Sequence, residues 1–173
     1  GLCVFSLLSY FESFFEEIRT FFQKAYSKGI IKKGISFMCG ISGYLDTKYG
    51  VDIRLLKQMT NVIRYRGPDD EGYALMTRGG TVFCSGDDTM PSLALPRLET
   101  AEKSGAFLGF GHRRLSILDL TEGGHQPMYL PERELTVTYN GELYNYLELR
   151  GELESLGHRF HTSSDTEVLL HAY

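Results

Sequence analysis

The sequence has 173 residues, of which 42% are hydrophobic and 13% aromatic, and this is enough for one domain with a packed core. The formal net charge of −4, without blocks of like charge, argues against a basic surface for nucleic acid or anionic lipid. The three cysteines form no CxxC pair, so we expect no disulfide framework and predict a reducing cytoplasm as the compartment. One globular domain with neither a nucleic-acid nor a membrane partner is therefore expected.

Residues 1–37 differ from the rest of the chain because they are rich in phenylalanine and slightly basic. Charged residues interrupt the apolar run over residues 4–22, so it is unsuited to span a membrane, and the positive charges follow the apolar part, unlike in a secretory signal. Three interpretations remain: an amphipathic interfacial or partner-binding helix, a pro-segment, or codons upstream of the true start. The last is favoured, since the chain begins with Gly1 and its first methionine is Met38. We predict an extension over residues 1–37 and a domain over residues 38–173.

The first half of the domain is predicted to contain a strand, a helix and a hairpin. A short apolar run bounded by glycines predicts a strand over residues 39–45. Asp52 then opens a helix over residues 53–65, and two β-rich runs on either side of Gly79-Gly80 predict a hairpin. Residues 87–105 have no clear period and are expected to form a surface insertion. The apolar face of the helix is expected to contain Leu55, Leu56, Met59, Val62 and Ile63.

The second half alternates strands and helices. Residues 107–120 are β-rich, and residues 134–146 begin as an alternating strand that reaches Asn140-Gly141. A helix over residues 147–156 and a short strand over residues 158–162 follow. The last helix starts near Ser164, which has a capping-box spacing to Glu167. Short, mostly antiparallel strands with helices outside them predict an α+β layered domain.

Cys39 is the first candidate for chemistry because it directly follows Met38. A lone intracellular cysteine is usually a small buried apolar residue. If translation starts at Met38, removal of the methionine leaves Cys39 with a free α-amine, whose pKa of about 7.7–8.0 suits it to take the thiol proton. Nucleophile and base would then share one residue. A peptide bond on Cys39 would abolish this base, so a retained extension predicts a non-catalytic interaction or membrane-surface module.

The other candidate residues each have a structural interpretation beside the functional one. Asn140-Gly141 is a strong hairpin signal, Asp165 could simply place a negative charge in the first turn of a helix, and Arg114 precedes a mostly apolar run, which favours a partly buried guanidinium with an anionic partner. The histidines match no triad spacing, and no histidine or cysteine cluster has the spacing of a metal site. We therefore expect no metal in this chain.

Six segments of the domain occur in the order found in one known family. They are MCGISGYLD, RGPDDEG, GHRRLSILDL, GGHQP, YNGELYNYLELR and SSDTEVLLHAY. Together they resemble the class II glutamine amidotransferase domain, most specifically the glutaminase half of the glutamine-hydrolysing asparagine synthetase family. The resemblance covers residues 38–173 and implies a layered α/β/β/α N-terminal-nucleophile sandwich with mostly antiparallel strands. Allied amidotransferases that modify cell-surface sugars are similar in the second and third segments.

The resemblance implies a role for each matching residue. Cys39 would attack the side-chain amide of glutamine, releasing ammonia and leaving a γ-glutamyl thioester that water hydrolyses to glutamate. The Asn140 side chain and the Gly141 N–H would form the oxyanion hole. Arg114 would bind the substrate α-carboxylate and Asp165 the α-ammonium group. Further substrate-binding residues implied by the resemblance are Leu115, Ser116, Ile117, Leu118 and Glu142.

The resemblance also implies partners outside this chain. Ammonia would pass to an ATP-dependent synthetase domain, for which ATP and Mg²⁺ are expected. The sequence contains no SGGxDS-like phosphate loop, and the amidotransferase domain is expected to be truncated before its last strands. The predicted partners are thus L-glutamine and the synthetase domain, with a second copy of the chain left open, and no cofactor is expected in this chain itself.

Overall fold

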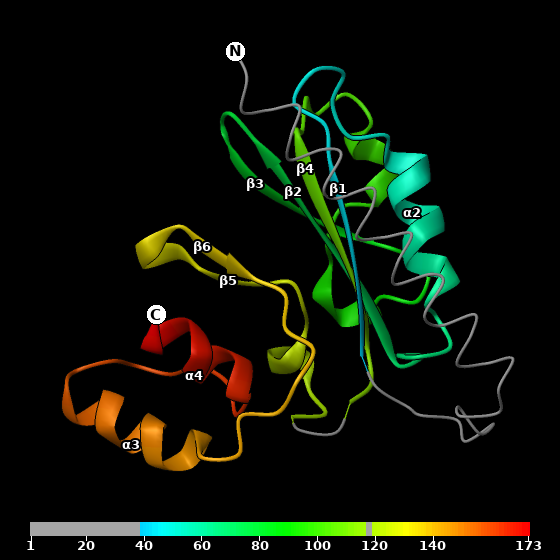
Figure 1. Cartoon of the computed structure of the whole chain (residues 1–173). Coiled ribbons are helices and arrows are strands. Elements are labelled where there is room, and N and C mark those ends of the chain that lie inside the picture. The colour runs from blue at the N-terminus through cyan, green and yellow to red at the C-terminus, as the bar shows by residue number, and fades with distance from the viewer. Residues whose placement is uncertain (1–38, 117–118) are drawn as a thin grey trace, which may run out of the picture. The chain divides into compact units, whose positions relative to one another are not determined.

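The computed structural model describes residues 39–116 and 119–173 (Figure 1). The predicted extension over residues 1–37 and the predicted site residues Ile117 and Leu118 lie outside the described residues. Short 3-10 helices η1 (Pro91–Leu93), η2 (Leu98–Ala101), η3 (Glu122–Gly124) and η4 (Pro131–Arg133) occur in the connections. The main elements are β1 (Gly40–Leu45), α2 (Ile53–Val62), β2 (Asp70–Thr77), β3 (Gly80–Ser85), β4 (Leu108–Arg114), β5 (Met128–Leu130), β6 (Leu135–Val137), α3 (Tyr146–Ser155) and α4 (Asp165–Ala172).

A four-stranded antiparallel sheet with the order β1-β4-β2-β3 forms the centre of the described chain. The predicted strand at residues 39–45 and the hairpin around Gly79-Gly80 are confirmed by β1 and by the β2–β3 pair. In the register of the sheet, Gly40 faces Arg113 and Asp70 faces Arg114. The beginning of β1 and the end of β4 therefore lie side by side at the same end of the sheet.

Helix α2 begins where the sequence predicts, because the Asp52 carboxylate caps it by accepting hydrogen bonds from the N–H groups of its first turn. The predicted apolar face is partly wrong. Ile53, Leu56 and Thr60 are the buried residues, whereas Val62 is 74% exposed. The helix packs against β1 and β4 along one narrow stripe, so apolar residues beside that stripe remain in solvent.

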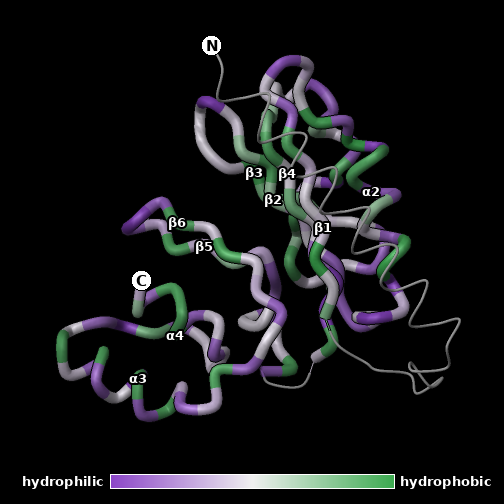
Figure 2. The backbone as a smooth tube through the Cα atoms, viewed as in Figure 1, coloured by the Kyte–Doolittle hydropathy of each residue, from purple (hydrophilic) through white to green (hydrophobic). Residues whose placement is uncertain are grey.

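The core lies between α2 and the sheet and includes fully buried Tyr73, Leu75 and Cys84. Figure 2 shows hydrophobic segments along β2 and β4 and a hydrophilic tip on the β5–β6 hairpin. Leu98, from the predicted surface insertion at residues 87–105, is also fully buried in this core. The insertion is therefore only partly a surface feature, since one of its side chains helps to fill the core.

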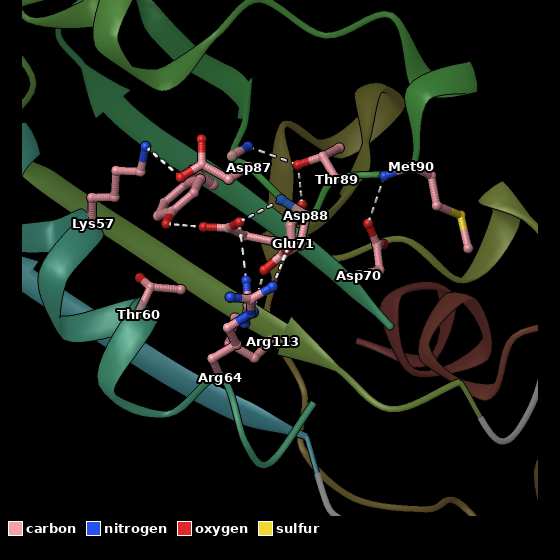
Figure 3. A network of polar contacts seen from close by, with 12 residues as sticks. Lys57, Thr60, Arg64, Asp70, Glu71, Asp87, Asp88, Thr89, Met90 and Arg113 are labelled. Atoms are coloured by element: carbon pink, nitrogen blue, oxygen red, sulfur yellow. Dashed lines mark hydrogen bonds and ion pairs between the residues drawn. The ribbon is translucent and has the colours of Figure 1, made fainter. Parts of the chain in front are cut away.

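A buried ionic network lies within the sheet region (Figure 3). The Arg113 and Glu71 side chains are both fully buried, with Nη1 of Arg113 3.0 Å from Oε2 of Glu71. Arg113 Nη2 also donates to Asp88 Oδ2 at 2.6 Å, and Asp88 receives a second hydrogen bond, from Arg64, at 2.7 Å. The hydroxyl group of Tyr73 donates to the Glu71 carboxylate. The network thus joins β2, β4, the turn after α2 and the start of the insertion.

The second half contains the two-stranded sheet β5–β6 and helices α3 and α4, and three local predictions differ from the structure. No hairpin forms at Asn140-Gly141, because β6 ends at Val137 and the chain continues into α3. Residues 158–162 form no strand. Ser164 caps α4, but the Glu167 carboxylate accepts from His161 N and Thr162 N and not in a capping box.

The predicted fold class is confirmed at the level of a mixed α/β domain with antiparallel sheets. The finer expectation of four α/β/β/α layers stays a prediction. In the part of the chain that the structure describes, no helix has the length and apolar character needed to cross a bilayer.

Candidate active site

Cys39 lies at this end of the sheet, directly before β1. Its Sγ accepts a hydrogen bond from Leu115 N at 3.3 Å and lies 3.7 Å from Leu115 O. Arg66 Nε donates to the Cys39 carbonyl oxygen at 3.1 Å. The other described cysteine, Cys84, is fully buried, and burial raises the pKa of its thiol to about 11. Of these two thiols, Cys39 is therefore the better candidate nucleophile.

Arg114 ends β4 beside this cysteine and is only 4% exposed. Its guanidinium donates to the carbonyl oxygens of Thr121, at 3.1 Å, and Asp119. Gly124 packs directly against it, since a Cβ placed on Gly124 would lie 1.9 Å from Arg114 Nη2. The chain between residues 119 and 124 therefore sets the orientation of the guanidinium.

Asp165 is the first residue of α4 and is 6% exposed. A carboxylate is favoured there by the helix dipole. Its Oδ2 accepts a hydrogen bond from Leu143 N at 2.9 Å, which links the start of α4 to the segment that follows Asn140-Gly141. The helix terminus and this loop are thus held side by side.

A small cavity of about 60 Å³ brings most of the predicted site residues together. Asn140 is exposed and does not line it, nor does Ser116, whose backbone N–H donates to Asp69 at 2.8 Å. Both residues sit next to lining residues in the sequence. The predicted residues that do line the cavity are Cys39, Arg114, Leu115, Gly141, Glu142 and Asp165.

Five lining residues were not predicted as site residues: Gly124, Gln126, Tyr139, Ser164 and Thr166. Gly124 and Gln126 belong to the GGHQP segment, and Tyr139 is the first residue of the YNGELYNYLELR segment. Membership of these segments is the sequence signal that could have identified them as site residues. Tyr139 packs on Gly141, where a Cβ would lie 2.6 Å from its hydroxyl oxygen. Burial, helped by the nearby Asp165 and Glu142 carboxylates, raises the pKa of Tyr139, so its hydroxyl group stays protonated near neutral pH.

A second, larger cavity of about 590 Å³ is lined in part by residues 119–123, but by none of the predicted site residues. No cluster of three or more histidine, cysteine or acidic residues suited to a metal ion occurs within residues 39–116 and 119–173. The smaller cavity is the better candidate site, because it combines a thiol, a guanidinium and a carboxylate. These three groups match a nucleophilic attack on an amino-acid substrate.

Comparison with known proteins gives consistent results. Residues 100–173 match the family described as "Glutamine amidotransferase domain". The chain is 36% identical over 140 residues to asparagine synthetase 1 of Bacillus subtilis, an alignment that covers 79% of this chain and 17% of that protein. It is 32% identical over 152 residues to a putative asparagine synthetase of Methanocaldococcus jannaschii, covering 79% and 24% of the two chains.

A glutamine–fructose-6-phosphate aminotransferase of Thermus thermophilus is 34% identical over 135 residues, covering 78% of this chain and 22% of that protein. The chain thus spans less than a quarter of the length of each of these curated relatives. The family match and the similarity across most of the chain show that it contains a domain of the glutamine amidotransferase family, homologous to part of the asparagine synthetases.

Proposed function

We propose that the domain hydrolyses L-glutamine to glutamate and ammonia as the glutaminase half of an asparagine-synthetase-like amidotransferase. The observation that carries the proposal is the single cavity lined by Cys39, Arg114 and Asp165. A free amino acid carries one negative and one positive group beside its side chain. One guanidinium and one carboxylate beside a thiol are the complement of such a substrate.

In the proposed reaction, the Cys39 thiolate attacks the side-chain amide carbon of glutamine. The α-amine of Cys39, free when this residue begins the chain, takes the thiol proton and passes it to the leaving ammonia. The resulting γ-glutamyl thioester is then hydrolysed by water. The contact from Leu115 N supports the proposal, because it holds the sulfur at the wall of the cavity that Arg114 and Asp165 also line.

The developing oxyanion needs donors near the attacked carbon. We assign this role to the Gly141 N–H and to the Asn140 side-chain amide, which turns toward the cavity when glutamine enters. One donor of this kind is worth about 10²–10³ in rate. Arg114 binds the α-carboxylate and Asp165 the α-ammonium group in the same proposal. Leu115, Ser116, Ile117, Leu118 and Glu142 complete the glutamine pocket.

The proposal extends to the whole protein. Ammonia passes to a synthetase domain that uses ATP and Mg²⁺, and the domain adopts the four-layer α/β/β/α arrangement of N-terminal nucleophile enzymes. We propose aspartate as the ammonia acceptor, because several relatives are named asparagine synthetases, and keep a sugar as the alternative. A reducing cytoplasm suits a nucleophilic thiol, and a homodimer is a further proposal.

The test compares native protein with the Cys39→Ala and Asp165→Asn variants, using mass spectrometry to identify the first residue of each. We expect Cys39→Ala to abolish glutamine hydrolysis and Asp165→Asn to raise the KM for glutamine at least tenfold. Continued hydrolysis by Cys39→Ala would show that another group is the nucleophile. Inactive native protein that retains residues before Cys39 would instead support a non-catalytic module.

A further inference from the structure

Gln126 is buried at the candidate site and bonds to two separate parts of it. Its Oε1 accepts a hydrogen bond from Tyr139 N at 2.6 Å, and its Nε2 donates to Thr166 Oγ1 at 3.3 Å. The Gln126 side chain is 7% exposed, and it lines the cavity together with both partners. The amide side chain of Gln126 therefore connects the loop at Tyr139 to helix α4 at Thr166.

The two partners of Gln126 adjoin groups with different proposed tasks. Tyr139 directly precedes Asn140-Gly141, the proposed oxyanion donors, and its ring packs on Gly141. Thr166 directly follows Asp165, the proposed ligand of the substrate ammonium group. The distance between these two groups must match the length of glutamine. Gln126 joins the two residues that adjoin these groups.

Gln126 can hold this distance only if its own segment is anchored, and contacts of the two preceding residues anchor it. Nδ1 of the preceding His125 lies 2.7 Å from Oδ2 of Asp70, which is almost fully buried on β2. The residue before that, Gly124, packs against the Arg114 guanidinium. The GGHQP segment is thus anchored to the central sheet on both β2 and β4.

We propose that Gln126 is a positioning residue that sets the placement of the oxyanion donors relative to the ammonium-binding end of the site. This inference rests on the proposed glutaminase function. Loss of the bond to Tyr139 N frees the loop that carries Asn140 and Gly141, so the main effect falls on the chemical step. Loss of the bond to Thr166 loosens the first turn of α4, so the main effect falls on substrate binding.

The experiment uses the full-length protein with Cys39 as its first residue and measures kcat and KM for glutamine hydrolysis. We expect Gln126→Leu to lower kcat by about 10- to 100-fold, since a misplacement of about 1 Å in a reacting group can cost about 10² in rate. The nearly isosteric Thr166→Val keeps the bond to Tyr139, so it should raise KM several-fold with kcat within about twofold. The double variant should be little worse than Gln126→Leu alone, because both changes remove the same brace.

Thr60→Val is the matched control. Thr60 is as buried as Thr166, and its hydroxyl lies 2.7 Å from that of Ser42, but it is in α2 and does not line the cavity. This variant should lose stability while kcat and KM stay within about twofold of native values.

Three results would overturn the inference. In the first, Gln126→Leu and Thr166→Val lose stability but keep kcat and KM, like Thr60→Val, which would make the brace purely structural. In the second, Gln126→Leu raises KM alone, which would make Gln126 a substrate-binding residue. The third is an unaltered Kd for glutamine when Thr166→Val is added to Cys39→Ala, as measured by calorimetry. A native protein that binds glutamine without hydrolysing it would refute the proposed function instead, and the Kd comparison would still test the brace.

Discussion

The buried pair of Arg113 and Glu71 should make a single substitution, Arg113→Met, one of the most destabilising in the domain. Both side chains are fully buried, so the substitution leaves the Glu71 carboxylate in the core with the Tyr73 hydroxyl and the Asp88 N–H as its remaining donors. Removing one partner of a buried ion pair typically costs about 3–5 kcal/mol, because the other charge stays uncompensated. For a domain of this size that corresponds to a fall in Tm of roughly 10–20 °C.

The matched control is Arg97→Met. Arg97 also pairs with an aspartate, Asp87, but its side chain is 48% exposed, and exposed pairs contribute about 1 kcal/mol or less. The double variant Arg113→Met with Glu71→Gln should recover part of the loss, since no buried charge is then left without its counterion. Urea unfolding and thermal unfolding followed by circular dichroism would measure all four proteins.

Equal losses for Arg113→Met and Arg97→Met would refute this reasoning. That result would mean that water or a rearranged side chain replaces the guanidinium at Glu71 without much cost. A double variant less stable than Arg113→Met alone would also contradict it, because the Glu71 charge would then not be the source of the loss.

Two further substitutions follow from local geometry. Gly124→Ala should displace the Arg114 guanidinium and raise the KM for glutamine at least about tenfold. The control is Gly151→Ala in α3, where a Cβ meets nothing within 4 Å, and it should stabilise the helix by about 0.5–1 kcal/mol with KM unchanged. An unchanged KM in Gly124→Ala would show that the guanidinium does not bind the substrate. Burial, with repulsion from His125, lowers the pKa of His112 to about 3. Below pH 6.5 the His112 imidazole therefore binds a proton in the unfolded chain but not in the folded one. The free energy of unfolding should fall by up to about 1.4 kcal/mol per pH unit between pH 6.5 and 3, a slope that His112→Gln should reduce and that urea titrations at several pH values would measure.

The sequence was sufficient where the deciding interactions are local or depend on the chemistry of a motif. The Asp52 cap of α2 and the β2–β3 hairpin depend on neighbouring residues, and both formed as predicted. Cys39, Arg114 and Asp165 were identified through the family resemblance, and the structure brings them to one cavity.

Local signals misled where a distant group competes for the same backbone atoms. Glu167 has the spacing of a capping box, but its carboxylate accepts instead from the N–H groups of His161 and Thr162, which removes these residues from any strand. Asn140-Gly141 is a hairpin signal only if a second strand follows, and α3 follows instead. Residues 87–105 have no clear period, but the structure forms the short helix η2 within them and buries its first residue, Leu98, in the core.

By itself, the sequence determined the order of the motifs, and through it the family resemblance and the candidate nucleophile. Only the tertiary structure decided which of these groups meet and what holds them. Register in the sheet places the beginning of β1 beside the end of β4, and Gln126 joins residues 139 and 166. Such contacts depend on the packing of elements far apart in the chain, which spacing along the sequence does not encode.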